Sequence, residues 1–275
     1  MPELPETETI ARDLDAELAG RAIVEVSVRR ADVLREVDAA ELRRRTVGVG
    51  IDRAWRRAKL IVLDLSSGDR IVVQPRFTGA LLLARGPLPA AEAPYSTLRL
   101  QLDDGRDLHY RDIRRLGTFA LMDERRFAGY EGELGVEPLD PAFTSAHLSA
   151  LLRVSRQALK KVLMDQRVVV GLGNIYANEA CWRAGLDPSR LARDVTDDEA
   201  IALHAAITSV LAESIAARGT SFRDYVDAHG GKGDLERSLA VYGRGGEPCL
   251  RCGARLIETH VIDGRSTVLC AGCQR

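Results

Sequence analysis

Four cysteines near the C-terminus constrain the fold of this chain more than any other feature. They form a C-x2-C-x17-C-x2-C array made of Cys249, Cys252, Cys270 and Cys273. Two such pairs suit two knuckles that hold one tetrahedral ion, with a hairpin between them that turns at Gly264. Because four thiolates leave no open coordination position, we expect one structural Zn²⁺ and a catalytic centre elsewhere.

Disulfide pairing of these cysteines would require an oxidising compartment, and the N-terminus does not predict secretion. It carries Glu3, Glu6 and Glu8 and lacks a basic segment followed by an apolar one. The main apolar runs are strand-sized, far below the roughly 20 residues of a membrane helix. We therefore expect a cytoplasmic protein with no membrane segment. We expect the fifth cysteine, Cys181, to be a small buried residue of a helix.

Hydrophobic spacing divides the rest of the chain into a β-rich half and a helical half. Apolar residues recur at helical spacing from Pro5 to Leu18, and Gly20 ends that helix. From Ala22 to about Met122, short β-rich runs separated by turn pairs predict an antiparallel sandwich or barrel. The expected strands are Ile23–Val28, Val47–Ile51, Leu60–Leu65, Ile71–Val73, Ala80–Leu83, Leu98–Leu102 and Leu108–Tyr110. The segment 86–94 is rich in proline and alanine and predicts a surface loop without chemistry.

The period becomes helical after Gly135. Thr196 and Glu199 form a capping box that opens the last of four expected helices. Those helices are Ser145–Leu152, Gln157–Met164, Ile175–Ala184 and Thr196–Ala217. We predict an α+β protein with a β-sandwich domain over 1–125, a helical domain over 126–236 and a four-cysteine finger over 237–275. The finger is too short to bury a core of its own, so metal binding has to fold it.

The formal net charge of -1 argues against a nucleic-acid partner, but the basic residues are clustered. Six arginines lie between residues 237 and 275, and two further clusters occur. The further clusters are Arg53, Arg56, Arg57 and Lys59, and Arg111, Arg114 and Arg115. Each cluster is equally explained as a solvated face, so charge alone leaves the partner open.

Several separate motifs resemble one family. The start Pro2-Glu3-Leu4-Pro5-Glu6-Thr7-Glu8-Thr9 is, by itself, also explained as an arm that begins a helix. It is, however, similar to the N-terminal signature of formamidopyrimidine-DNA glycosylases. Segment 57–60 resembles the lysine strand of that family, segment 112–117 its D-P-R-R-F-G loop, and segment 165–177 its helix-two-turn-helix motif. Segments 241–244 and 264–267 and the terminal Cys273-Gln274 fit its zinc finger.

The resemblance implies a bifunctional DNA glycosylase and AP lyase of base excision repair. Such an enzyme excises oxidised purines, 8-oxoguanine and formamidopyrimidines, through a Schiff base on Pro2 and cleaves the strand by β,δ-elimination. Removal of Met1 would free the Pro2 amine, Glu3 would act as acid and base, and Glu6 would support them. Lys59 would contact the phosphate beside the lesion. The partner would be damaged double-stranded DNA, bound by a monomer without a nucleotide cofactor.

The same resemblance assigns the residues that contact DNA. Phe77, Arg114 and Leu116 would fill the space left by the flipped nucleotide. The others would bind phosphates or support that contact: Arg115, Lys160, Asn174, Tyr242 and Arg265.

The chain departs from the family pattern at the residues that fill the duplex. Where the family has H-L-G-M-S/E-G, this chain has Gln74-Pro75-Arg76-Phe77-Thr78-Gly79, and Leu116 replaces the family aromatic. The aromatic often found in the base-covering loop is also missing from segment 230–239. Two alternatives therefore stay open. One is the endonuclease VIII activity on oxidised pyrimidines, although Leu4 disagrees with its usual P-E-G-P-E start. The other is a DNA-binding protein without catalysis.

Overall fold

The helix expected at the start of the chain forms as α1 (Leu4–Leu18). It begins with Pro5 in its first turn and a capping box between Glu3 and Glu6, and its apolar residues Ile10 and Leu14 are buried. The computed structural model describes residues 2–221 and 224–275, except the side chains of residues 236 and 237.

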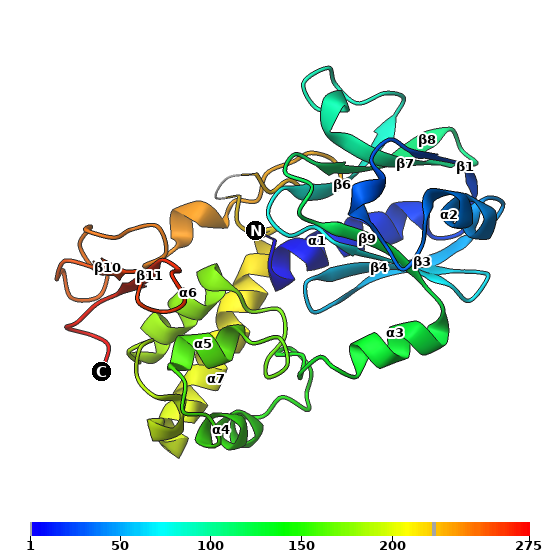
Figure 1. Cartoon of the computed structure of the whole chain (residues 1–275). Helices are drawn as coiled ribbons and strands as arrows, with labels where there is room; N and C mark the ends of the chain where they lie inside the picture. Colours follow the sequence, from blue (N-terminus) through cyan, green and yellow to red (C-terminus); the bar gives the residue numbers. More distant parts are fainter. Residues whose placement is uncertain (1, 222–223) are drawn as a thin grey trace. The chain divides into compact units, whose positions relative to one another are not determined.

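Two sheets follow α1, and the sandwich predicted from the β-rich runs is confirmed (Figure 1). The first sheet is antiparallel, in the order β1 (Ile23–Val28), β7 (Ser96–Leu102), β8 (Arg106–Asp112) and β6 (Gly79–Arg85). The second has the order β2 (Leu34–Arg35), β9 (Thr118–Met122), β5 (Arg70–Gln74), β4 (Leu60–Leu65) and β3 (Ile51–Arg57). Within it, β2 runs parallel to β9 and the other neighbours are antiparallel.

One hydrophobic core joins both sheets to α1. Alternate residues of the strands point into it, among them Leu100 of β7, Leu63 of β4 and Phe119 of β9, and Leu14 of α1 belongs to the same core. The short helices α2 (Ala39–Thr46) and α3 (Glu124–Glu131) lie outside the sandwich core, apart from Leu42.

Five α-helices and strands of this half were missed or misplaced in the sequence, among them β2 and β9, which have no counterpart among the expected strands. The expected strand Val47–Ile51 is wrong, because the strand that forms is β3, which begins at Ile51. β3 has the sequence IDRAWRR, whose arginines pair with carboxylates on β4, α1 and α3 and hide the apolar pattern. Helices α2 and α3 are mainly polar and bury only two residues and one residue, respectively, so periodicity gave no signal for them.

The four helices expected after Gly135 all form, as α4 (Ser145–Arg153), α5 (Leu159–Met164), α6 (Asn174–Ala184) and α7 (Asp197–Ala216). Thr196 and Glu199 make the predicted capping box, with Thr196 N donating to Glu199 Oε2 over 2.8 Å. Two strands, β10 (Ile257–Thr259) and β11 (Thr267–Leu269), make the expected hairpin. Four short 3-10 helices complete the described elements: Ala31–Val33, Ala93–Tyr95, Ala192–Asp194 and Leu235–Ser238.

Helix α7 is long and apolar enough, by length and composition, to cross a membrane. It begins with three acids, however, and its apolar residues serve packing: Leu203, Ile207 and Leu211 are buried, and α7 contacts α4 and α6. The helix therefore has the pattern of a core helix.

The described chain forms two compact units, which differs from the three predicted domains. One unit combines Met1–Gly132 with Ala217–Asp234, and the other combines Glu133–Ala216 with Leu235–Arg275. The predicted boundary near 125 is close, but the segment Ala217–Asp234 returns to the sandwich, where Tyr225 and Ala228 join its core. The finger, predicted as a separate domain from residue 237 on, packs on the helices of the second unit.

Gly117 is required where the loop after β8 meets β5. A Cβ there would lie 2.6 Å from the carbonyl oxygen of Gln74 and would also strike the hydroxyl of Tyr110. We expect Gly117→Ala to destabilise the sandwich by about 1–3 kcal/mol, measured as a lower midpoint of denaturant unfolding.

Gly129 in α3 provides the matched control, since a Cβ there meets nothing within 4 Å. Gly129→Ala should leave stability unchanged or raise it by about 0.5–1 kcal/mol. Equal midpoints for both variants would contradict the close approach at Gly117.

Candidate functional site

The first residues of the chain are held by hydrogen bonds to two carboxylates. Pro2 is buried directly before α1. Glu3 N donates to Glu6 Oε2 over 2.8 Å, and the Glu3 side chain caps the helix in return. The other oxygen of Glu6 accepts from Thr220 N over 2.8 Å. Glu3 and Glu6 are each 1% exposed, so two acids are held beside Pro2 in a buried setting. Met1 lies outside the described residues.

Lys59 lies in a turn and not in a strand, which corrects the expected lysine strand. Arg57 of β3 pairs with Leu60 of β4, so Ala58 and Lys59 form the two-residue connection, with Ala58 at a positive φ of 54°. This turn and Pro2 lie at the same end of α1 and β3, as two contacts show. Arg56 contacts Glu8 (Nε–Oε2 2.8 Å), and further along the helix Asp15 accepts from Ala54 N (2.8 Å), so α1 runs antiparallel to β3.

The three residues expected to fill the duplex lie on two loops of the sandwich and are exposed. Phe77 is 46% exposed and Leu116 40% exposed. The guanidinium of Arg114 lies over the Phe77 ring, 5.1 Å from its centre. Phe77 is therefore not a core residue, and the two loops meet through a cation–π contact.

A buried polar network fixes these two loops to each other. The Thr78 hydroxyl donates to Asp112 Oδ1 over 2.5 Å and accepts from Arg114 N over 3.0 Å. The second oxygen of Asp112 accepts from Gly117 N over 2.8 Å. Thr78 and Asp112 are 4% and 1% exposed, and neither was identified from the sequence. The sequence signal that could have found them was their position. Thr78 directly follows Phe77, and Asp112 lies two residues before Arg114, and both Phe77 and Arg114 were predicted to contact DNA.

Arg115, predicted to bind DNA, is exposed and makes an ion pair with Asp32 over 2.8 Å. It sits at a positive φ of 52°, a conformation that arginine adopts only at a sharp change of chain direction. An exposed pair of this kind contributes little to stability, so Arg115 can exchange Asp32 for another anion.

In the helical unit, Asn174 opens α6 after a tight loop. Gln166 holds this loop by accepting from Gly171 N (2.9 Å) and donating to the carbonyl of Leu172 (2.9 Å). The side-chain oxygen of Asn174 is buried, and no described residue provides a hydrogen-bond partner for it. The start of α6 is thus a well-fixed position where a helix N-terminus can receive an anion.

Lys160 does not support the prediction that it contacts DNA. It is 0% exposed, and its ammonium group donates to the carbonyl of Ser266 (2.7 Å) and the hydroxyl of Thr267 (2.8 Å). A buried charge keeps such partners because desolvation without them is costly. Lys160 therefore holds strand β11 on the helices.

Two side chains of α6 hold the finger, and neither was predicted from the sequence. Glu179 accepts backbone N–H groups of Ala240, Val241 and Tyr242, each over 2.9 Å. The side-chain oxygen of Asn178 accepts from Val268 N over 2.9 Å. The available signal was that two polar residues stand on the buried face of a helix, where they need partners.

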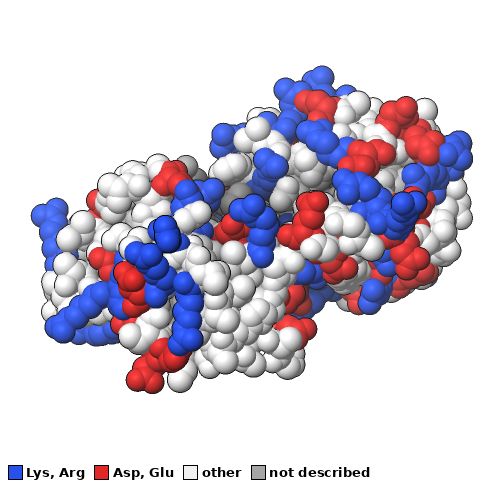
Figure 2. All heavy atoms as spheres, turned by 60° about the horizontal axis from the view of Figure 1, so that its bottom comes forward, with Lys and Arg blue, Asp and Glu red and all other residues white. Residues whose placement is uncertain are grey.

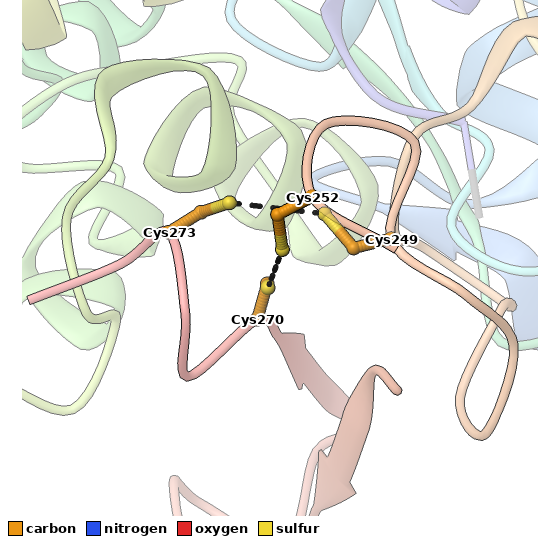
Figure 3. Close-up of side chains that lie close together, drawn as sticks. All are labelled: Cys249, Cys252, Cys270 and Cys273. Carbon is orange, nitrogen blue, oxygen red and sulfur yellow. Dashed lines mark hydrogen bonds between the residues drawn. The ribbon is translucent and has the colours of Figure 1, made fainter. Parts of the chain in front are cut away.

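The four predicted cysteines converge on one metal site (Figure 3). Their sulfurs all lie within 4.8 Å of one another, with Cys249 Sγ 4.0 Å from Cys273 Sγ and Cys252 Sγ 3.4 Å from Cys270 Sγ. Zn–S bonds of about 2.3 Å in a tetrahedron put sulfurs about 3.8 Å apart, so these residues fit Zn²⁺.

A helix residue touches this metal site. Trp182 Nε1 of α6 lies 3.4 Å from Cys249 Sγ, and the guanidinium of Arg251 lies over the Trp182 ring, 4.5 Å from its centre. Cys181 is fully buried, and burial raises the pKa of its thiol to about 12, so its role as a small buried residue is confirmed.

The hairpin tip presents Arg265. Asp263 and Gly264 both have positive φ, 52° and 65°, and turn the chain before the exposed Arg265. Tyr242 is half-buried, with its backbone on Glu179. Figure 2 shows Lys and Arg side chains on the face drawn, with acidic side chains among them, so the basic residues form local groups and not one continuous patch.

Comparisons with known proteins cover the chain. Residues 1–119 match the family model for the formamidopyrimidine-DNA glycosylase N-terminal domain, residues 134–226 that for its H2TH domain, and residues 246–275 a zinc finger found in FPG and IleRS. The formamidopyrimidine-DNA glycosylases of Carboxydothermus hydrogenoformans and Desulforamulus reducens are 41% and 40% identical. Each alignment covers 100% of this chain and at least 99% of the relative.

Solved structures of the Lactococcus lactis enzyme superimpose closely. A complex of an Fpg variant with a Fapy-dG containing DNA gives a TM-score of 0.92 at 29% identity, with 100% of both chains covered. A complex of Fpg with an abasic site containing DNA gives 0.91, with 99% of both chains covered. Fold, metal site and matches together define a DNA repair glycosylase with a zinc finger. The chain belongs to the formamidopyrimidine-DNA glycosylase family.

Metal content distinguishes the two kinds of cysteine. The protein should contain one zinc per chain, and Cys249→Ala should lose it and unfold the hairpin, because metal binding folds so small a segment. Trp182 emission should change with the metal, since its indole lies against Cys249 Sγ. Cys181→Ala is the control and should keep one zinc per chain. Full zinc content in Cys249→Ala would contradict the site.

Proposed function

We propose that this chain is a bifunctional DNA glycosylase and AP lyase that excises oxidised purines from double-stranded DNA, with Pro2 as nucleophile. The observation that carries the proposal is the position of Pro2, which is buried at the start of α1 beside Glu3 and Glu6. The DNA in two solved Lactococcus complexes, one with Fapy-dG and one with an abasic site, supports the proposal.

The chemistry follows from a secondary amine. The neutral nitrogen of Pro2 forms a bond to C1′ while the bond from C1′ to the damaged base breaks and the base leaves with the electron pair. The nitrogen then loses its proton, and protonation of the sugar ring oxygen opens the ring and leaves an iminium ion between Pro2 and C1′. Because the iminium withdraws electrons, removal of a proton from C2′ expels the 3′ phosphate, and removal of a second proton from the sugar then expels the 5′ phosphate. Ordinary α-amino groups have a pKa of about 7.7 to 8.0, so the neutral form needs no unusual environment.

The two acids have different roles in this scheme. Glu6 already binds two backbone N–H groups, one on each oxygen, and so acts as a positioning residue. Glu3 is adjacent to Pro2 and is the nearer acid along the chain, so we assign it protonation of the ring oxygen and the later proton transfers.

Phosphate contacts are assigned to exposed or half-buried groups of both units. Lys59 stands in its turn at the Pro2 end of α1, and Arg265 stands at the hairpin tip. Asn174 is the first residue of α6, so the backbone N–H groups of a helix N-terminus, which favour a phosphate, lie next to it. Tyr242 and Arg115 complete the set. Their basic or donor groups fix the duplex but do not read its sequence.

Phe77, Arg114 and Leu116 are assigned to fill the space left by the flipped nucleotide. Their exposure and the Thr78–Asp112 network that holds their loops support this role. We also infer that the enzyme acts as a monomer in the cytoplasm, where reducing conditions keep zinc thiolates intact.

Excision of oxidised pyrimidines is the second candidate function. A Lactococcus Fpg has been solved with an oxidised pyrimidine containing DNA, and the exchanged apolar residues at Phe77 and Leu116 alter the surface that meets the duplex. A panel of duplexes with 8-oxoguanine, a formamidopyrimidine, a dihydropyrimidine or an abasic site ranks these substrates. A protein that binds all four and cleaves none would be the non-catalytic alternative.

Borohydride trapping tests the nucleophile. The protein should form a covalent adduct with an abasic or 8-oxoguanine duplex, because reduction fixes the iminium on Pro2. Pro2→Gly should give much less adduct, and acetylation of the N-terminus should abolish it. Peptide mapping locates the link. An undiminished adduct on protein that retains Met1 would show that another amine reacts.

A substrate comparison tests the role of Phe77. Phe77→Ala should slow excision of a paired 8-oxoguanine by roughly tenfold or more, because extruding a stacked base costs a few kcal/mol. Cleavage of an abasic duplex should suffer far less, since no base has to be extruded.

Thr78→Val extends the same comparison to the network beneath the loops. Thr78→Val removes the hydroxyl that donates to Asp112 while keeping the shape of the side chain. Like Phe77→Ala, it should slow excision of 8-oxoguanine more than cleavage of an abasic duplex, whereas Thr78→Ser should keep the normal ratio of these two rates. Equal losses on both substrates would assign Phe77 and Thr78 to general stability.

A further inference from the structure

A pocket of about 460 Å³ lies on the outer face of the four-stranded sheet, beneath the loop predicted to lack chemistry. Segment 86–88 and Ala93 form its cover, and β1, β7 and β8 form its floor. Its volume falls in the range of small-molecule sites, roughly 300–1,000 Å³. It is lined by Ser27, Arg29, Leu88, Leu98, Arg99, Asp107 and His109, among others.

Two polar side chains in this pocket are buried without being satisfied. Asp107 is 5% exposed and His109 6% exposed, although the outer face of a sheet is normally solvated. Asp107 Oδ1 and His109 Nε2 have no hydrogen-bond partner among the described residues. Burying such an atom without a partner destabilises the fold, so a site that retains both indicates a group that satisfies them when bound.

Neighbouring residues fix how these two side chains are oriented. Ser96 Oγ lies 3.0 Å from His109 Nδ1 and orients the ring, while His109 Nε2 lies 4.0 Å from Asp107 Oδ2. The nearby carboxylate favours the imidazole proton on Nε2, which makes this atom a donor. Burial lowers the pKa of His109, so the ring is neutral at neutral pH. Beneath the covering segment 86–88 there are thus one donor and one charged acceptor side by side.

A donor next to an acceptor complements the N–H and C=O of a cyclic amide. The carboxylate would accept the amide N–H, and His109 would donate to the carbonyl oxygen. The apolar side chain of Leu88 suits a flat ring, and the guanidinium of Arg99, 3.7 Å from Asp107, can stack on one.

We propose that this pocket binds a nucleobase through its lactam edge, as a free base or a nucleoside, at a site separate from Pro2. Asp107 and His109 read the edge, and the segment 86–88 covers the ring. Because solvent does not reach Asp107 Oδ1 or His109 Nε2, the base has to displace that segment to bond them. The site does not depend on the glycosylase reaction proposed above.

Calorimetric titration of the zinc-loaded full chain with hypoxanthine tests the proposal. Hypoxanthine carries the lactam edge, and in 1-methylhypoxanthine a methyl group replaces the hydrogen of that N–H. Hypoxanthine should bind saturably, and the methylated base should bind about tenfold or more weaker, since it cannot donate to Asp107. Inosine distinguishes a nucleoside site from a free-base site. Hydrogen exchange of segment 86–95 should change when hypoxanthine binds.

Variants separate the pocket from the rest of the sheet. Leu88→Trp fills the pocket without touching the polar pair, and Asp107→Leu removes the acceptor, so each should reduce hypoxanthine affinity about tenfold or more. Gln101→Ala, on β7 but outside the pocket lining, should bind normally. All three should retain cleavage of abasic DNA, which shows that they fold. Failure of hypoxanthine to bind, equal affinity for both bases or undiminished binding by Leu88→Trp would each overturn the proposal and leave a water-filled cavity.

Discussion

The rest of the sandwich unit's chemistry depends on one carboxylate, that of Glu6, which binds two backbone N–H groups. Chain termini ordinarily fray, so the proposed nucleophile on the second residue has to be held in place by residues further along the chain. Glu6 ties Glu3 to the helix and also accepts from Thr220 N, which is distant in sequence. Gly219 makes this approach possible: its φ is 86°, and a Cβ there would lie 3.0 Å from Glu6 Cγ. The return of Ala217–Asp234 to the sandwich is thus part of holding Pro2.

The helical unit uses the same device for its finger. Glu179 binds three consecutive backbone N–H groups before the first cysteine, and Lys160 binds the strand that precedes the third. Buried charges do little for stability by themselves but fix one arrangement when they are fully paired. Zinc folds the finger, and these side chains set how the finger sits on α5 and α6. Metal and helix therefore act together to determine where Arg265 stands.

Much of the fold could be predicted because period and spacing are local properties. α1, the four later helices and the cysteine array follow from the order of apolar residues and from ligand spacing. β3 could not, since its charged residues are explained only by partners such as Glu8 and Asp64 on other elements. Lys160 was assigned to DNA for the same reason: burial of a lysine is decided by residues about a hundred positions away. The roles of Pro2 and Glu3 required the family resemblance, because the residues alone also describe a plain helix start.

The exchanged residues Phe77 and Leu116, on the two loops assigned to the duplex, have a physical consequence beyond shape. A methionine in place of Phe77 could not offer the ring face that holds the Arg114 guanidinium at 5.1 Å. With Asp112 and Thr78 fixing the backbones beneath, both loops are held in one arrangement before DNA arrives. Preordered loops lose less conformational entropy on binding, but they adapt less to a distorted duplex. The preference of this protein among lesions should therefore depend more on how each lesion deforms the DNA than it does in relatives with the flexible methionine. The reason is that the two loops of this protein change their conformation less on contact with DNA.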